Sequence, residues 1–203
     1  MTWLWISGWA VPADWLAKQA TEIFPRIRHE AVPADPEGTW RHERVHYDRL
    51  IGYSLGAFLL LREERREPSG RPAALLAPFL AFPREANLGG RVAMTRLRYL
   101  ERWLRRDQSA ATTDFYRRAG LDELNGKTEP VSDTDLLRRG IEVLMRETEP
   151  AGSGPWFTAF ACDNDPLIDS TRLSALLPGL KVIPGQNHHP APLMRALAGE
   201  WPC

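Results

Sequence analysis

The sequence around Ser54 constrains the fold more than any other feature of the chain. Ser54 lies between Gly52 and Gly56, in the pattern Gly-x-Ser-x-Gly. The run 47–52 before it predicts a short strand, and the run 55–67, rich in Leu, Ala, Glu and Arg, predicts a helix. Side chains two residues before and two after the serine would obstruct a sharp turn between the two elements, so glycine is needed there. The pattern therefore predicts a strand, a tight turn and a helix, with the Ser54 hydroxyl held out at the end of a sheet.

This placement makes Ser54 a candidate nucleophile. The amides at the N-terminus of the following helix point toward the serine. Such amides stabilise the negative charge that develops on a carbonyl oxygen when a hydroxyl attacks the carbonyl carbon. The alternative interpretation is a glycine-bracketed turn in which Ser54 only caps the helix.

The composition predicts one folded domain of moderate size. The chain has 203 residues, 43% of them hydrophobic, which is enough for one sizeable core and an inserted subdomain. Because the formal net charge is zero, the composition favours neither a nucleic-acid partner nor a disordered chain.

Cysteine usage and hydropathy indicate the compartment. Cys162 lies in an apolar run and Cys203 is the last residue, so we expect no structural disulfide. The N-terminal residues lack the positive region and the long apolar stretch of a signal peptide. No segment reaches the roughly 18 to 20 apolar residues that a membrane span needs. We therefore expect a soluble protein of a reducing cytoplasm, without a membrane partner.

Strand-like and helix-like runs alternate along much of the chain. The expected strands are 2–7, 27–32, 47–52, 73–82, 156–162 and 180–183, and the expected helices are 15–24, 39–45, 55–67, 169–177 and 191–197. Asp14 is the expected cap of the first helix, and Pro78 must end the fourth strand or lie at a bulge. This alternation predicts an α/β fold, with a mostly parallel sheet of about six strands and right-handed crossovers.

A helical segment interrupts this alternation after the fourth strand. Residues 84–150 show no convincing strand pattern, so we expect a lid subdomain there, inserted into a core made of residues 1–83 and 151–203. The apolar residues of the lid can line a pocket or simply pack the lid onto the core. They are Leu88, Val92, Met94, Leu97, Leu100, Trp103, Leu104, Phe115 and Tyr116.

Charge is unevenly distributed within this expected lid. Residues 84–118 contain nine arginines and four acids, whereas residues 119–150 contain four bases and eight acids. The arginines can face outward and attract an acidic partner. Alternatively, they can pair with the acids of the second half across a helical hairpin, which would cancel the field.

Two later residues are candidate partners of Ser54. A serine hydroxyl needs a base to remove its proton, and the base needs an acid that fixes its tautomer. Asp165 follows the 156–162 strand, and His188 follows the 180–183 strand. Carboxyl ends of parallel strands meet at one edge of a sheet, so both can reach Ser54. Asp163 or Asp169 could replace Asp165, and His189 could replace His188.

An attacked carbonyl also needs two backbone donors for its oxyanion. The residue after the nucleophile, Leu55, supplies one amide, and Trp9, in the loop after the first strand, supplies the other. The Trp9 ring can pack in the core at the same time. Adjacent histidines rarely bind one metal ion together, so we expect neither a metal site at His188 and His189 nor a cofactor.

With these residues in place, the chain resembles the α/β-hydrolase superfamily over its whole length. The matching segments are Gly52-x-Ser54-x-Gly56, 165–168 and Gly185-x-x-His188-x-Pro190. Within the superfamily the chain looks most like compact members of the pimeloyl-acyl-carrier-protein methyl ester esterases of biotin synthesis. That similarity is carried by the Gly8-Trp9 loop, the serine turn and the segment 136–144. Ser7-Gly8 stands where the family usually has His-Gly, and the antiparallel strands that usually precede the first strand are absent.

The resemblance implies a cytoplasmic serine carboxylic-ester hydrolase that works through an acyl-enzyme. In it, Ser54 attacks the ester, His188 transfers the proton and Asp165 orients His188. The substrate would be a small or carrier-linked acyl ester, and an acyl carrier protein would bind at the arginine-rich lid. The alternatives are another reaction of the same fold, such as carbon–carbon bond hydrolysis or a lyase reaction, and a non-catalytic ligand-binding protein. The sequence does not specify the acyl chain, the leaving group or the oligomeric state.

Overall fold

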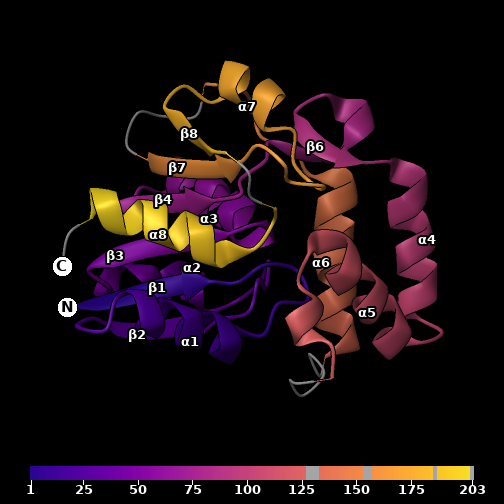
Figure 1. Cartoon of the computed structure of the whole chain (residues 1–203), viewed down its shortest axis with the longest axis horizontal. Coiled ribbons are helices and arrows are strands. Elements are labelled where there is room, and N and C mark those ends of the chain that lie inside the picture. Colours follow the sequence, from indigo (N-terminus) through magenta and orange to yellow (C-terminus); the bar gives the residue numbers. More distant parts are fainter. Residues whose placement is uncertain (127–132, 153–156, 185–186, 202–203) are drawn as a thin grey trace.

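The computed structural model describes residues 1–126, 133–152, 157–184 and 187–201, and its core is a single six-stranded sheet (Figure 1). The strands run in the order β2-β1-β3-β4-β7-β8, and every neighbouring pair is parallel. They are β1 (Thr2–Ile6), β2 (Arg28–Val32), β3 (Arg49–Tyr53), β4 (Ala73–Leu76), β7 (Phe157–Cys162) and β8 (Leu180–Ile183). The predicted six-stranded parallel sheet is therefore confirmed.

The central strands are apolar because helices cover both faces of the sheet. Every residue of β4 is buried, and so are the last four residues of β3, Leu-Ile-Gly-Tyr. A strand that is buried on both faces cannot alternate polar and apolar residues, so it reads as a continuous hydrophobic run. This is why these strands could be found in the sequence.

Right-handed crossovers decide which face each helix covers. The helices of the core are α1 (Ala13–Ile23), α2 (Trp40–Glu43), α3 (Leu55–Arg66), α7 (Ser170–Leu176) and α8 (Pro190–Glu200). The chain moves outward from β1 to β2 and in the opposite direction from β3 to β4, so α1 and α3 lie on opposite faces. α8 packs beside α1 (Figure 1). Short 3-10 turns at Arg44–His46, Arg84–Ala86 and Asp122–Leu124 complete the main elements.

The cap predicted for the first helix is wrong. Helix α1 begins at Ala13 with the extended residue Pro12 as its N-cap, and no side chain caps it. Asp14 instead lies in the first turn, where its negative charge still interacts favourably with the helix dipole.

The predicted fourth strand, 73–82, is really two strands in two sheets. After β4 ends, Ala77 adopts a left-handed conformation with φ of 51° and turns the chain just before Pro78. Strand β5 (Ala81–Pro83) then pairs in parallel with β6 (Gly89–Val92) in a separate two-stranded sheet. The expectation that 84–150 contains no strand is therefore wrong. A Cβ added to Gly90 would lie 1.8 Å from the Phe82 carbonyl oxygen, so glycine is needed for β6 to lie this close to β5. Because glycine is uncommon inside strands, its presence also argued against predicting a strand here.

The rest of the expected lid, as far as the structure describes it, is mainly helical. It contains α4 (Met94–Leu104), α5 (Gln108–Ala119) and α6 (Thr134–Arg146), which lie together beyond the carboxyl ends of the sheet strands (Figure 1). The division into a core of 1–83 and 151–203 and a lid of 84–150 stays a prediction. Within the described ranges, none of the helices has the length and apolarity needed to cross a membrane.

Gly56 offers a test of how closely the turn at Ser54 packs against the first strand. A Cβ added at this position would lie 2.1 Å from the carbonyl oxygen of Ile6 and 2.4 Å from that of Ser7. Both are backbone atoms, at the end of β1 and in the residue after it, so the clash cannot be relieved by a side-chain rotation. We expect Gly56→Ala to lower the free energy of unfolding by about 3 kcal/mol, measured by chemical denaturation.

The matched control is Gly199→Ala near the end of α8. An added Cβ meets no atom within 4 Å there, so alanine should raise the free energy of unfolding by about 0.5–1 kcal/mol through its better helix propensity. Equal effects of the two substitutions would contradict the packing described for Gly56.

Candidate active site

Ser54 occupies a strained turn between β3 and α3. Its φ is 55° and its ψ is −116°, a conformation that non-glycine residues rarely adopt and that costs about 1–3 kcal/mol. The surrounding backbone maintains it: the Ser54 amide donates to the Leu76 carbonyl at 2.8 Å, and a Cβ at Gly52 would lie 2.5 Å from the Gly56 carbonyl oxygen. The Ser54 side chain makes no capping hydrogen bond to α3. The alternative interpretation as a helix cap is therefore wrong.

The structure brings the Ser54, His188 and Asp165 side chains together in one hydrogen-bonded chain. His188 Nε2 lies 3.0 Å from Ser54 Oγ, and His188 Nδ1 lies 2.6 Å from Asp165 Oδ2. Relative exposure is 6% for Ser54, 1% for His188 and 0% for Asp165, so these three side chains are almost completely shielded from water. This arrangement allows His188 to accept the Ser54 proton while the carboxylate holds the opposite ring nitrogen.

The two competing acids lie elsewhere. Asp163 is exposed. Asp169 is the N-cap of α7, where its Oδ1 accepts from the Arg172 amide at 2.9 Å. Of the three, Asp165 alone contacts His188 among the described interactions.

The Asp165 loop is held by β6, a contribution that sequence reasoning missed. Asp165 Oδ1 accepts hydrogen bonds from the amides of Leu167 at 2.8 Å and Ile168 at 3.1 Å. Arg91 Nη1 donates to the Asp165 carbonyl at 3.0 Å, and the Arg91 amide donates to the Leu167 carbonyl at 2.9 Å. An isolated antiparallel bridge joins Gly90 to Ile168. β6 therefore fixes the loop that aims the carboxylate, and only the fold brings the two segments together.

Tyr53, the residue before Ser54, supports His188 through a hydrogen bond and a ring contact. The Tyr53 hydroxyl donates to the His188 carbonyl at 2.7 Å, and the two ring centroids are 5.4 Å apart. Burial, followed by the charge of Asp165, raises the pKa of Tyr53 well above its ordinary value. Tyr53 thus stays protonated and remains a donor.

His189 takes no part in the hydrogen bonds that join Ser54, His188 and Asp165. Its Nδ1 accepts from the Ala191 amide at 3.1 Å, which makes it the N-cap of α8, and its Nε2 lies 2.7 Å from Glu123 Oε1. Its ring also makes an edge contact with Trp15. These contacts occupy both ring nitrogens, so His189 has none left for Ser54.

Cys162 does not offer an alternative nucleophile. It is a free, buried thiol at the end of β7. Burial, with smaller effects from the charges of Asp165 and Asp163, raises the pKa of Cys162 to about 12. Because the thiolate is the reactive form, this side chain is inert near neutral pH.

The loop after β1 lies directly against the serine, as an oxyanion site requires. A Cβ added to Gly8 would lie 3.2 Å from Ser54 Cβ, closer than most such contacts, so glycine favours this approach. Leu55 is the first residue of α3, where a helix amide has no partner in its own helix. Among the described residues, neither the Trp9 amide nor the Leu55 amide has a recorded acceptor. Their role as oxyanion donors stays a prediction.

Helix α6 packs directly on these two residues. The Trp9 indole nitrogen donates to the Leu137 carbonyl at 2.8 Å. A Cβ at Gly140 would lie 2.7 Å from the Trp9 ring and 3.2 Å from a Leu55 methyl group. The helical segment is thus bonded to the loop beside Ser54, and Trp9 both packs with the lid and presents its amide.

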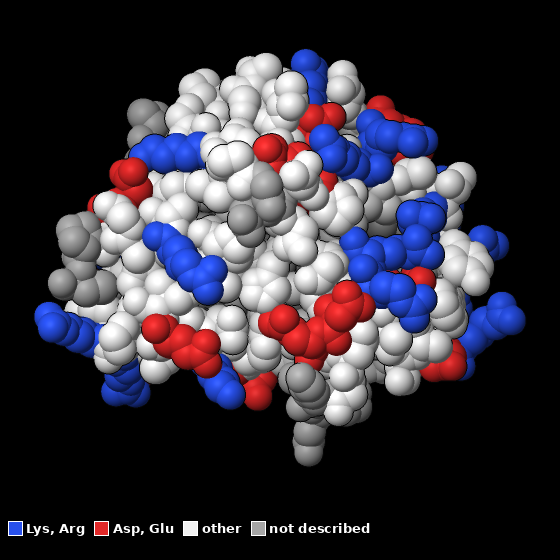
Figure 2. Space-filling model, viewed as in Figure 1, with Lys and Arg blue, Asp and Glu red and all other residues white. Residues whose placement is uncertain are grey.

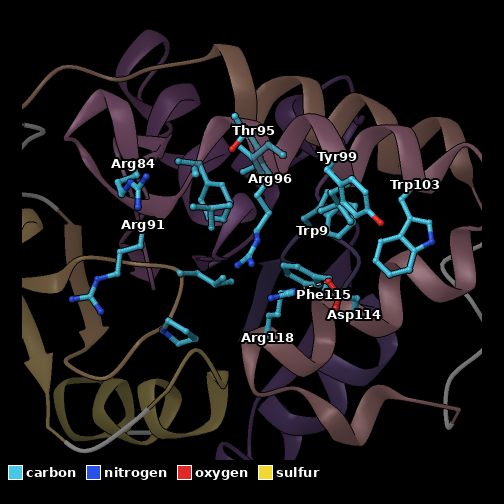
Figure 3. A pocket seen from close by; sticks show the side chains of 18 residues that line it. Trp9, Arg84, Arg91, Thr95, Arg96, Tyr99, Trp103, Asp114, Phe115 and Arg118 are labelled. Atoms are coloured by element: carbon cyan, nitrogen blue, oxygen red, sulfur yellow. Dashed lines mark hydrogen bonds and ion pairs between the residues drawn. The ribbon is translucent and has the colours of Figure 1, made fainter.

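A cavity of about 610 Å³ opens beside this site, between the core and α4 and α5 (Figure 3). Its lining includes Trp9, from the loop that lies against Ser54, and Pro166 and Leu167, from the loop of Asp165, but not Ser54, His188 or Asp165 themselves.

Five of the nine apolar lid residues proposed from the sequence as pocket lining do line the cavity, namely Val92, Leu97, Leu100, Trp103 and Phe115. The other four, Leu88, Met94, Leu104 and Tyr116, do not line it. Tyr116 has a different role, because its hydroxyl donates to the Ala10 carbonyl at 2.6 Å and ties α5 to the loop after β1.

Asp165→Asn tests the assignment of the acid. The amide would leave the His188 ring without the carboxylate that selects its tautomer, so we expect kcat for ester hydrolysis to fall by about 10⁴-fold. Asp163→Asn is the matched control at the exposed position two residues earlier, and we expect its kcat to stay within about twofold of the parent. Steady-state kinetics on one activated ester measures both, and a larger loss in Asp163→Asn would exclude Asp165 as the acid.

Comparison with known proteins identifies the fold. No family model and no curated protein matches the sequence. Among solved structures, an esterase from Exiguobacterium antarcticum matches with a TM-score of 0.72 and 10% identity, over 98% of this chain and 91% of that chain. BioG from Haemophilus influenzae matches with a TM-score of 0.65 and 13% identity, over 92% of this chain and 88% of that chain. An N-formylmaleamic acid deformylase from Pseudomonas putida S16 matches with a TM-score of 0.55 and 13% identity, over 92% and 85%. The chain has the α/β-hydrolase fold.

Proposed function

We propose that this protein is a serine carboxylic-ester hydrolase that works through an acyl-enzyme. The observation that carries the proposal is the buried hydrogen-bonded chain from Ser54 through His188 to Asp165. A ligand-binding protein has no need of a nucleophile, a base and an orienting acid in this geometry. Esterases among the structural neighbours support the proposal at the level of the fold.

In the acylation step, Ser54, His188 and Asp165 each have one role. Ser54 Oγ attacks the ester carbonyl carbon while its proton moves to His188 Nε2, and Asp165 stabilises the resulting imidazolium. The carbonyl oxygen gains a negative charge that the Trp9 and Leu55 amides bind, each donor contributing about 10²–10³-fold in rate. The tetrahedral intermediate then collapses. The alcohol leaves with the proton from His188, and the acyl group stays on Ser54.

Deacylation repeats these steps with water. His188 removes a proton from the water that attacks the acyl carbonyl, and the same two amides bind the second oxyanion. Collapse of this intermediate returns the proton to Ser54 Oγ and releases the carboxylic acid.

Covalent labelling and hydrolysis together test this function. We expect a fluorophosphonate to label the parent protein on the peptide that contains Ser54, and p-nitrophenyl esters to be hydrolysed. Labelling without hydrolysis of any ester would replace the esterase with another reaction of the same fold. Absence of both would favour a non-catalytic binding protein.

More specifically, we propose that the substrate is a carrier-linked ester of the kind that pimeloyl-acyl-carrier-protein methyl ester esterases cleave in the cytoplasm. Lys and Arg gather over α4–α6 and β6 on the face shown in Figure 2. Arg105 and Arg118 pair with acids of their own helices, and Arg91 pairs with Asp169. Among the described residues, no ion pair joins an arginine of 84–118 to an acid of 119–150. This absence of pairing across the two halves supports the proposal that these arginines attract an acidic carrier.

Charge reversal at Arg102, Arg105 and Arg106 tests this partner. The expected result is a lower kcat/KM for a carrier-linked ester relative to a small soluble ester, with the largest effect at low salt, because steering acts on the association rate. An equal loss on both esters would indicate a destabilised lid. An unchanged ratio would exclude these arginines as the carrier surface.

A further inference from the structure

The backbone of β6 and the loop that carries Asp165 are joined at two points. The Arg91 amide donates to the Leu167 carbonyl at 2.9 Å. In the opposite direction, the Asp169 amide donates to the Gly89 carbonyl at 2.8 Å. These bonds hold the middle and the end of the loop, but neither of them reaches Asp165 itself.

The Arg91 side chain supplies the contact with Asp165 that the strand backbone does not make. Its Nη1 donates to the Asp165 carbonyl at 3.0 Å. Among the interactions of the described residues, no other donor contacts this carbonyl, and Asp165 is fully buried. A buried carbonyl without a donor is costly, so the guanidinium fixes the main chain of Asp165. In Figure 3 the Arg91 side chain points away from the middle of the cavity that it borders, whereas Arg96 points into it.

The Asp165 carboxylate depends on this main chain for its position. Its Oδ1 accepts from the Leu167 and Ile168 amides of the same loop, and its Oδ2 lies 2.6 Å from His188 Nδ1. The carboxylate is therefore fixed relative to its own loop, and a displacement of the loop moves Oδ2 relative to the imidazole. A small displacement of this kind lowers the rate although no reacting group is lost.

We propose that Arg91 is a positioning residue, which holds the Asp165 loop where the carboxylate can orient His188. Its contact is with the main chain of the acid and not with Ser54 or the imidazole. This inference rests on the proposed function and adds to it a residue outside the serine–histidine–aspartate chain. Because Arg91 also borders the cavity, a direct contact between its charge and a substrate is the alternative role.

Arg91→Met separates the two roles, because methionine keeps an unbranched stem but has no donor and no charge. The backbone bonds of β6 remain, so we expect the fold to be retained, as thermal unfolding can verify. We expect kcat for an activated ester to fall by about tenfold, with KM within about twofold of the parent. Tenfold is the lower end of what a hydrogen bond from a charged donor contributes, since the Arg91 side chain is 39% exposed.

Arg84→Met is the matched control. Arg84 lines the same cavity and carries the same charge, but among the described interactions it makes no hydrogen bond to the Asp165 loop. We expect its kcat to stay within about twofold of the parent. An equal loss of kcat in the two variants, or a rise of KM alone in Arg91→Met, would overturn the proposal in favour of a charge that contacts the substrate.

Proton NMR separates this proposal from the proposed function. The proton between His188 Nδ1 and Asp165 Oδ2 lies in a short hydrogen bond, so its signal is far downfield and reports that bond whether or not an ester is hydrolysed. If no ester is hydrolysed, the esterase proposal fails, and the signal still tests the role of Arg91. A signal that moves upfield or is lost to exchange in Arg91→Met, and not in Arg84→Met, would support the positioning role. The same signal in Arg91→Met as in the parent would overturn it.

Discussion

Ser54→Ala is expected to lower kcat for ester hydrolysis by about 10⁴-fold or more while leaving the fold intact. The substitution removes only Oγ, the atom that lies 3.0 Å from His188 Nε2, and it adds no atom to the crowded turn. The hydroxyl, the imidazole and the carboxylate act as a unit, so loss of the nucleophile removes nearly all of their joint contribution. The oxyanion donors and substrate binding would leave a small residual rate.

The measurement pairs steady-state kinetics with thermal unfolding. Ser174→Ala serves as the control, because it deletes a hydroxyl that bonds only within α7, to the Ser170 carbonyl. We expect the midpoint of unfolding of Ser54→Ala to stay within a few degrees of the parent, since no packed group is lost. Activity of Ser54→Ala within tenfold of the parent would show that the turn does not present a nucleophile.

Local chemistry explains why the main features of the site could be predicted from the sequence. The turn at Ser54 needs two glycines at fixed spacing, and the structure shows backbone atoms where their side chains would be. Asp165 and His188 follow strands that are mostly apolar, although β8 contains the exposed Lys181, and parallel strands place such residues at one edge of the sheet. Each of these inferences depends on residues that are close together in the sequence.

The features that could not be predicted depend on contacts between distant segments. β6 contains two glycines and forms a strand only because it pairs with β5, and Arg91 supports the Asp165 loop from 74 residues away in the sequence. Asp14 has the right residue type for a cap, but the N-cap is Pro12, two residues earlier. Charge counts in the lid likewise did not reveal that Arg105 and Arg118 pair with acids of their own helices.

His188→Ala is expected to lower kcat by about 10³–10⁵-fold, and His189→Ala by less than tenfold. Only the first substitution removes the base beside Ser54. It also leaves a buried Asp165 oxygen without its partner, which we expect to lower the free energy of unfolding by about 1–3 kcal/mol. The second removes the N-cap of α8 and the contact with Glu123, a loss of about 1 kcal/mol that does not reach the reacting atoms.

Measuring both kcat and stability of the two variants distinguishes the roles of His188 and His189. Both variants are assayed at a temperature well below their unfolding midpoints, so that differences in kcat report chemistry rather than the folded fraction. Glu123→Gln provides the matched control for His189, because it weakens the same contact from the lid side, and it should reproduce only part of the small loss of stability. A kcat that falls further in His189→Ala than in His188→Ala would reassign the base to His189. The loop after β8 would then have to rearrange, because in this structure His189 Nδ1 accepts from the Ala191 amide.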